Sequence, residues 1–286
     1  YLHLMHFLNK NEARSSIPTP LFNLINGAID PNTKLYDFNE FIIVPASSKG
    51  FQESLEICSS IHKSLKSLLS EKNYTISNEY NDITTQKIST NKEAFLLLKQ
   101  GTENLPFRVG LDVFFGINSK ASSFYKDEKY KIKDFPSPLS SEELLSFYNE
   151  LYHELDFLYI EDAFAEDDWV GWQSLSSIYF QKSTVAGGDL TATNLNRLQL
   201  ALSKKAINAI VIKPTQAGTV IESLAIAQAA RAMGLKIIVS HRSNETTDDF
   251  ISDFAVAVSS DYVKLGSLTR GENIAKYNRL LQIENQ

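Results

Sequence analysis

The sequence reads IVIK at 210–213, SHRS at 240–243 and YVKLG at 262–266. Each stretch completes a short β-branched run with a cation or a polar cluster. A strand that is buried on both faces reads as a continuous β-branched run, and the residue beyond its C-terminal end lies at the rim of the sheet. Three such stretches in succession predict a parallel α/β barrel whose functional groups lie at one rim.

Acidic strand ends extend this pattern toward the N-terminus. RVGLD ends at Asp112, FLYIED contains Glu161 and Asp162, and TVAGGD ends at Asp189. EFIIVPA is a further predicted strand, although its acid, Glu40, precedes the apolar run. A charged residue at a single strand end is usually just solvated. Six strand ends in a row favour a common site, in which the acids come first along the chain and the bases later.

The composition limits the classes of partner. The 286 residues include 28 Lys and Arg against 34 Asp and Glu, which gives a net charge of −6. Without basic runs, this balance argues against nucleic acid or an anionic membrane and favours a small molecule or a protein. Cys58 is the single cysteine, so no intramolecular disulfide can form, and a reducing, cytoplasmic location is predicted. No apolar run approaches the roughly 18 residues of a membrane helix, so we predict a soluble protein.

Local patterns predict the elements of the first half of the chain. Apolar residues at helical spacing predict a helix over 51–71, and a Ser-Ser-Glu-Glu start predicts another over 140–155. Residues 72–91 are polar and free of glycine, which predicts a long loop. We predict a lead-in segment at 1–17, followed by one barrel domain at 18–286.

Strands and helices alternate without interruption after residue 184. The predicted helices lie at 194–205, 219–233, 246–258 and 271–283, with β-branched strands between them. This alternation is typical of a parallel sheet with crossover helices.

The chain contains the motifs VGLD, YIEDAFAEDDWVGW, GDLTATN, IVIKPTQAGT, VSHRSNETTDDFISD and IAKYNRLLQIE. Together they resemble the C-terminal barrel domain of the enolase (phosphopyruvate hydratase) family, over residues 18–284. The resemblance implies a (β/α)8 TIM-like barrel in which the first pair of strands and helices is irregular. It also implies that the family's smaller α+β capping domain is absent from this chain apart from its exit.

The family reaction is the dehydration of 2-phosphoglycerate to phosphoenolpyruvate. The resemblance implies that two Mg²⁺ ions hold the substrate carboxylate while a lysine removes the α-proton. Such hard cations bind clustered carboxylate oxygens. By motif match, the implied site consists of the metal ligands Asp112 and Glu161, the base Lys213, the second lysine Lys264, the phosphate-binding Arg242 with His241 and Ser243, and the acid Glu40.

The chain departs from the family pattern at two chemically important positions. The family has G-D-D-L or A-D-D-L after the third acidic strand, whereas this chain has Gly188 at the ligand position and Asp189 as the acid that could replace it. The family's general acid is matched by Asn81, with Glu79 and Asp82 beside it. An amide cannot protonate a leaving hydroxyl, and removal of a general acid typically costs about 10²–10⁴ in rate.

A third loss lies near the N-terminus, where the family's N-G-G-S-H motif reads NGAID at 26–30 and lacks the active-site histidine. With the missing capping domain, these losses predict an enolase-like protein that is catalytically impaired or inactive and binds Mg²⁺ weakly or not at all, but keeps its anion-binding residues. Two alternatives stay open. One is an active enolase, which would be a lyase. The other is a scaffold that binds a protein partner through the barrel exterior and the loop 72–91. The sequence also leaves open whether the chain forms a homodimer.

Overall fold

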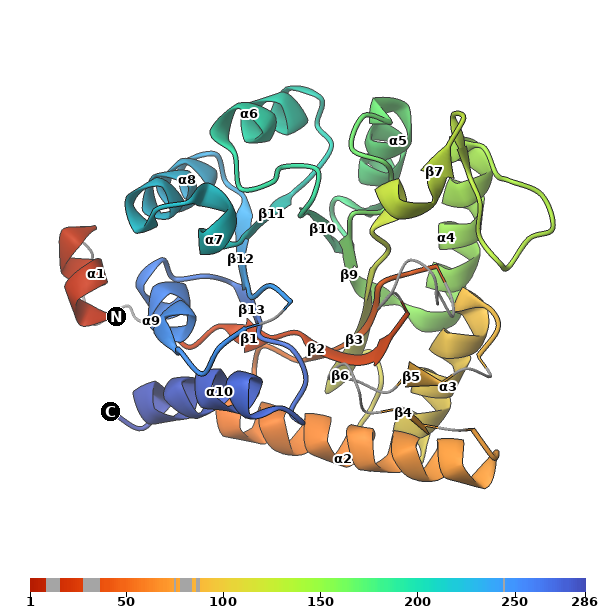
Figure 1. The fold of residues 1–286 in the computed structure, drawn as a ribbon, viewed down its shortest axis with the longest axis horizontal. Coiled ribbons are helices and arrows are strands. Elements are labelled where there is room, and N and C mark those ends of the chain that lie inside the picture. Colours follow the sequence, from red (N-terminus) through yellow and green to blue (C-terminus); the bar gives the residue numbers. More distant parts are fainter. Residues whose placement is uncertain (9–15, 28–36, 75, 78–83, 86–87, 244) are drawn as a thin grey trace.

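The computed structural model describes residues 1–286 except 9–15, 28–36, 75, 78–83, 86–87 and 244. The described residues form a ring of strands with helices packed around its outside (Figure 1). The predicted α/β barrel is therefore confirmed. No helix in this described part of the chain is both long and apolar enough to cross a membrane.

The main sheet is a nearly closed barrel. Its strands lie in the spatial order β1, β13, β12, β11, β10, β9, β6, β3, β2. Only Leu21 separates β1 from β2; β1 pairs with β13 and β2 pairs with β3, so the two ends of the sheet meet. The strands are β1 (Thr19–Pro20), β2 (Phe22–Asn26), β3 (Glu40–Pro45), β6 (Val113–Asn118), β9 (Phe157–Glu161), β10 (Thr184–Gly187), β11 (Ala209–Ile212), β12 (Lys236–Ser240) and β13 (Tyr262–Lys264).

One strand runs against the others. β3 is antiparallel to both of its neighbours, β2 and β6, whereas every other pairing in the barrel is parallel. The first residue of β3 therefore lies at the rim where the parallel strands end. This explains why Glu40 precedes its apolar run while the other acids follow theirs.

The helices pack on the outer surface of the barrel. Two of them, α2 and α3, follow each other between β3 and β6 and contact one another, which is the irregular start that the resemblance implies. The helices are α1 (Leu2–Phe7), α2 (Phe51–Glu71), α3 (Asn91–Glu103), α4 (Ser141–Leu155), α5 (Trp169–Tyr179), α6 (Leu195–Ser203), α7 (Pro214–Ala217), α8 (Val220–Ala232), α9 (Phe250–Ala257) and α10 (Gly271–Glu284).

The described residues also contain a short helical turn and two small hairpins outside the main sheet. A 3-10 turn spans Ala121–Phe124. Two small hairpins are formed by β4 (Ile76–Ser77) with β5 (Thr84–Thr85), and by β7 (Tyr125–Lys126) with β8 (Lys129–Tyr130). The first hairpin lies within the segment 72–91, which the sequence predicts to be a loop, so that prediction is wrong at these strand residues.

The predicted helices are observed with small shifts at their ends, but α1, α3, α5 and the four-residue α7 have no predicted counterpart. The helix expected at 246–258 begins only at Phe250, after the loop that follows β12. α3 begins after Thr90, whose hydroxyl accepts a hydrogen bond from Glu93 N (3.2 Å), a standard N-cap. α5 buries the ring of Trp172 completely and shows little amphipathic contrast, which conceals it in the sequence.

Both faces of the strands are buried. One apolar set contains only residues of the barrel and its strand junctions: Leu21, Ile42, Val44, Tyr159, Ala186, Ala209, Val211 and Ile238. The other set includes alternate strand residues such as Phe41 and Ile43 together with apolar helix residues, so it lies between the sheet and the helices. The first set therefore fills the barrel interior, and the two layers explain why the strands read as continuous apolar runs.

The strand predicted to end at Asp112 is placed wrongly. Residues 108–112 form a turn, in which Asp112 N donates to Arg108 O (2.8 Å) and Gly110 has a φ of +83°. The strand is β6, which begins at Val113 and ends at Asn118. Asp112 therefore lies before the strand, at the opposite end of the barrel from the rim that carries the other acids.

Candidate functional site at the rim of the barrel

Strand register brings three polar side chains side by side. Glu40 of β3 is paired with Asn118 of β6, and Asn118 is paired with Glu161 of β9. Side chains alternate along a strand, so residues two apart share a face. Glu40 and Glu161 thus share the face of Ile42 and Tyr159, which belong to the interior set. The rim acids consequently point toward the barrel axis.

Lys264, the last residue of β13, joins these acids. It is 2% exposed, and its Nζ lies 2.6 Å from Glu40 Oε2 and 2.6 Å from Glu161 Oε2. Burial opposes the ionisation of Glu40, but the charge and hydrogen bond of Lys264 outweigh it and lower the pKa of Glu40 to about 2. Burial likewise opposes the charge of Lys264, yet the two carboxylates raise its pKa above the usual value. Glu40 and Lys264 are therefore both charged at neutral pH.

Neutral donors complete the contacts of the two converging oxygens. Asn118 Nδ2 donates to Glu40 Oε2 (2.9 Å), and the Tyr159 hydroxyl donates to Glu161 Oε2 (2.6 Å). Glu161 is fully buried, and its second oxygen, Oε1, has no hydrogen-bond partner among the described residues. Since buried polar atoms are normally paired, Oε1 marks a point where a bound molecule can donate a hydrogen bond.

Asp162 holds the chain after β10 in place. Its backbone lies in the left-handed region (φ 48°), and its carboxylate accepts hydrogen bonds from Gly188 N (2.9 Å) and Asp189 N (2.8 Å). Burial, followed by the nearby charges of Glu161 and Asp189, raises the pKa of Asp162 to about 7, although Lys213 works in the opposite direction.

Gly188, at the expected ligand position, leaves no space for a side chain. A Cβ built there would lie 2.6 Å from Asp162 Oδ2 and 2.8 Å from Glu161 Oε1. Asp189 contacts Asp162 through its backbone N–H, and its own carboxylate makes no hydrogen bond or ion pair within the described part of the chain. Because β10 ends at Gly187, Asp189 lies in a turn, and the alternation of strand side chains does not decide its direction.

A histidine links the acidic cluster to the expected anion-binding loop. His241 follows β12, and its backbone N–H donates to Lys264 O (2.9 Å). Burial lowers the pKa of His241 to about 4, and Lys264 and Lys276 act in the same direction against the opposing charges of Glu40 and Glu245. The ring is therefore neutral at pH 7, and its buried Nδ1 has no partner among the described residues.

Arg242 and Ser243 lie on the exposed part of this loop. The loop is tethered at Arg242, whose backbone N–H donates to Glu245 Oε1 (2.9 Å). Lys276 of α10 also contacts this loop. The residue is 1% exposed, and its Nζ donates to Thr246 O (2.7 Å) and lies 3.3 Å from Glu245 Oε2. Arg242 thus follows His241 on a loop that is held by contacts at Arg242 and at Thr246.

Lys213 reaches the same rim from β11. It is the first residue after the strand, is half-buried, and its backbone N–H donates to the Thr193 hydroxyl (3.0 Å). The rim thus brings Glu40, Glu161 and Lys264 into direct contact, and Lys213 follows its strand at the same rim.

Asp112 does not belong to this site. Its carboxylate lies 3.0 Å from Arg108 Nε and 3.7 Å from Lys49 Nζ. These contacts lie at the start of β6, and the expectation that Asp112 is a metal ligand beside Glu161 is therefore wrong. Asn118 occupies the rim end of the same strand.

Several rim residues were missed by sequence reasoning. Asn118 is uncharged and so falls outside the pattern of charged strand ends, although the run VFFGI that precedes it is a clear strand signal. Tyr159 and Lys276 carry no local signal: Tyr159 reads as an ordinary aromatic residue of the strand FLYIE, and Lys276 reads as a helix residue although it also contacts the loop after β12. The predicted positions Asp30, Glu79, Asn81 and Asp82 lie outside the described residues.

The described residues do not fit a protein-held Mg²⁺ ion. Mg²⁺ requires near-octahedral oxygen ligands at about 2.0–2.1 Å. Among the described residues, no group of three or more acidic, histidine or cysteine side chains could hold a metal ion. The converging oxygens of Glu40 and Glu161 already accept hydrogen bonds from Lys264. Both oxygens of Asp162 accept hydrogen bonds from backbone N–H groups. Glu161 Oε1 and the Asp189 carboxylate are left without a hydrogen bond or ion pair among the described residues, which is too few for an octahedral set of protein oxygens.

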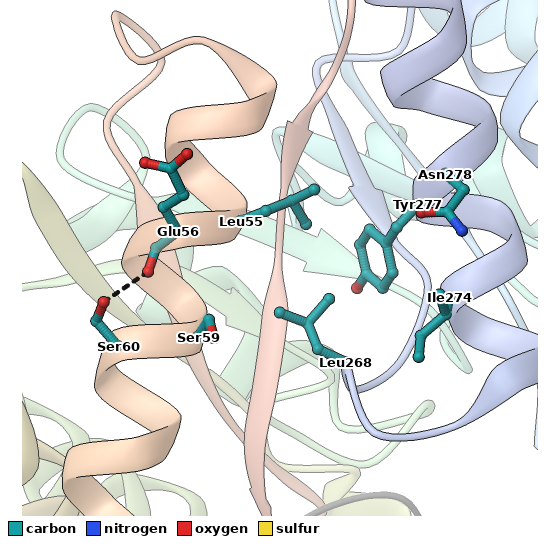
Figure 2. A pocket seen from close by; sticks show the side chains of 8 residues that line it. All are labelled: Leu55, Glu56, Ser59, Ser60, Leu268, Ile274, Tyr277 and Asn278. Carbon is teal, nitrogen blue, oxygen red and sulfur yellow. Dashed lines mark hydrogen bonds between the residues drawn. The ribbon is translucent and has the colours of Figure 1, made fainter.

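A surface hollow of about 460 Å³ lies apart from these acids, between α2 and α10 (Figure 2). Leu55 of α2 and Leu268 point toward the ring of Tyr277 of α10 across it. The Tyr277 hydroxyl donates to Gly266 O (2.6 Å). The hollow is lined by none of the rim residues Glu40, Glu161 and Lys264.

Comparison with known proteins shows the family of this chain. The family model described as the enolase C-terminal TIM barrel domain matches residues 14–286. The enolase of Ehrlichia ruminantium (strain Gardel) is 36% identical over 268 residues, which cover 94% of this chain and 63% of that protein. The enolase of Helicobacter pylori (strain J99) is 36% identical over 272 residues, covering 95% and 64%. The chain thus spans less than two thirds of the length of these relatives. On the evidence of its barrel and of these matches, the chain belongs to the enolase family and corresponds to that family's C-terminal barrel domain.

Proposed function

We propose that this enolase-related barrel binds a small phosphorylated carboxylic acid at its rim, and that it dehydrates 2-phosphoglycerate weakly or not at all. The observation that carries the proposal is the position of Lys264, 2.6 Å from both Glu40 and Glu161. The acids of the rim are thereby engaged with a side chain of the protein, next to a loop that presents Arg242 and a neutral His241.

The anion is bound on the basic side of the rim. An exposed guanidinium suits bidentate contact with a phosphate or a carboxylate. Arg242 supplies that group, while Ser243 and His241 can add a hydroxyl and a ring N–H. The buried Oε1 of Glu161 can accept a hydrogen bond from a hydroxyl of the ligand.

The two lysines have different proposed roles. Lys264 is held in its protonated form by two carboxylates, so it faces negative charge and does not accept a proton at neutral pH. Lys213 makes no such ion pair within the described residues and follows β11 at the same rim, so in any residual dehydration it would remove the proton next to the carboxylate. The expected general acid position, Asn81, carries an amide.

The family generally uses Mg²⁺, and we propose that the ion binds this chain weakly. The occupied oxygens of Glu40, Glu161 and Asp162 support this part of the proposal. A domain boundary after residue 17, a cytoplasmic location, a homodimer and a protein partner stay predictions.

The deciding experiment is steady-state conversion of 2-phosphoglycerate to phosphoenolpyruvate with saturating Mg²⁺, beside Lys213→Ala. We expect little or no turnover in either protein, with both folded by circular dichroism. Turnover in the wild-type protein that disappears in Lys213→Ala would contradict the proposal of impaired catalysis and establish an active enolase. This alternative is equally compatible with membership of the family.

Ligand binding is tested separately by calorimetry with phosphoenolpyruvate. We expect Arg242→Ala to weaken binding at least tenfold. Arg108→Ala is the matched control, because Arg108 is exposed at the opposite end of the barrel, beside Asp112. Equal affinity in wild type and Arg242→Ala, or no binding to either, would contradict the anion site.

A further inference from the structure

The oxygens that face each other across the rim already share a cation. Glu40 Oε2 accepts hydrogen bonds from Lys264 (2.6 Å) and Asn118 (2.9 Å), and Glu161 Oε2 accepts from Lys264 (2.6 Å) and Tyr159 (2.6 Å). Any metal ion that bound both oxygens would have to displace the Lys264 ammonium.

Because the cluster is buried, another cation cannot easily replace the Lys264 ammonium between the two carboxylates. The side chains of Lys264 and Glu161 are 3% and 0% exposed, so water screens their attraction little. Lys264 is also fixed by its backbone, because it closes β13 and its carbonyl accepts from His241 N (2.9 Å). The ammonium is therefore a built-in part of the strand ring, not the mobile end of a surface side chain.

We propose that Lys264 is the resident cation of this rim: it occupies the converging oxygens of Glu40 and Glu161, so that neither is free for a divalent ion, and the site binds its anionic ligand without a divalent metal. The second half of this inference rests on the proposed anion site, whereas the first half rests on the cluster alone. The ligand is a phosphate- or carboxylate-bearing small molecule that is held by Arg242 and its neighbours. Its affinity then does not depend on Mg²⁺.

The first test titrates the unliganded 286-residue chain with Mn²⁺ and follows the free ion by electron paramagnetic resonance. The wild-type protein should bind no Mn²⁺ at submillimolar concentration. One Mn²⁺ bound per chain with submillimolar affinity, and lost in Glu161→Gln, would overturn the inference. This measurement needs no variant that removes Lys264.

The second test removes the cation. In Lys264→Met, the two carboxylates lose their shared partner, so the variant should bind one Mn²⁺ at least tenfold more tightly than wild type, and Mn²⁺ should raise its melting temperature. Lys276→Met is the matched control, because Lys276 is equally buried but donates mainly to the carbonyls of Thr246 (2.7 Å) and Glu272 (3.0 Å). A folded Lys264→Met variant with no gain over this control would contradict the inference.

The third test measures phosphoenolpyruvate binding in EDTA and in excess Mg²⁺. Dissociation constants that agree within twofold support a metal-free site, and binding that weakens tenfold or more in EDTA overturns it. Absence of binding in both buffers would defeat the proposed function, and the Mn²⁺ titrations would still decide whether Lys264 is the resident cation.

Discussion

The two ends of strand β6 carry similar ionic chemistry in opposite surroundings. Just before the strand, Asp112 pairs with Arg108, whose side chain is 71% exposed. At the other end, Asn118 adjoins Glu40, whose partner Lys264 has a side chain that is only 3% exposed. An exposed pair gains little from its attraction, whereas a buried pair is costly to break because the remaining charge has no water around it. Burial, more than the presence of charge, therefore distinguishes the candidate site at the rim from the opposite end of the barrel.

Removal of the buried cation should have the largest effect. Lys264→Met leaves the carboxylates of Glu40 and Glu161 buried without their counter-ion, and breaking such a pair typically costs about 3–5 kcal/mol. Urea unfolding followed by circular dichroism measures the loss in the free energy of unfolding. Lys49→Met, at the Asp112 end, is the control and should leave the midpoint unchanged. Equal midpoints for the two variants would remove the distinction between the ends.

Acid should weaken the rim by a few kcal/mol. The pKa of Glu40 is about 2 in the folded protein against an ordinary value of 4.5, because Lys264 outweighs the effect of burial. A depressed pKa stabilises the fold above the ordinary value, and this contribution is lost as the pH falls from 4.5 to 2. Urea midpoints across this range should fall less steeply in Glu40→Gln than in wild type. Parallel profiles would show that Glu40 gains nothing from Lys264.

A side chain at Gly188 should cost about 1–3 kcal/mol, the usual range for overpacking a tight site. The added Cβ would approach Asp162 Oδ2 to 2.6 Å, so the carboxylate or the turn has to move. Gly271→Ala provides the control, because a Cβ there meets nothing within 4 Å. Gly188→Ala with a midpoint as high as that of Gly271→Ala would show that the turn adapts freely.

The smallest effect is expected at the exposed pair. Arg108→Ala removes the guanidinium from Asp112 but leaves the carboxylate in water. Its urea midpoint and its affinity for phosphoenolpyruvate should both match wild type within experimental error. A clear loss of either would mean that the two ends of β6 are coupled.

The strand pattern predicts much of this architecture because it depends on local sequence. Runs such as IVIK and KIIVS combine β-branched residues with a polar end, and Lys213 and His241 do follow strands at one rim. The strand predicted from RVGLD is wrong for an equally local reason. Gly110 adopts a positive φ and turns the chain, so the strand is the adjoining run VFFGIN.

The contacts of the rim could not be read from the sequence. Lys264 meets Glu40 and Glu161 only because barrel closure sets three separate strands in register. The reversed direction of β3, which delivers Glu40 to this rim, likewise depends on its pairing with β2 and β6. Periodicity gives the face on which a residue lies, but it does not give the neighbour across the sheet.

The place of Lys264 on the final strand has a consequence for how the chain folds. Its two acidic partners lie on β3 and β9, which are made much earlier, and β13 also closes the ring by pairing with β1. A partial barrel without β13 holds two inward-facing carboxylates with no cation between them and an open sheet edge. Contacts between segments so distant in sequence form slowly. We therefore expect closure of the last strand to be the late, cooperative step of folding, in which ring closure and charge neutralisation occur together.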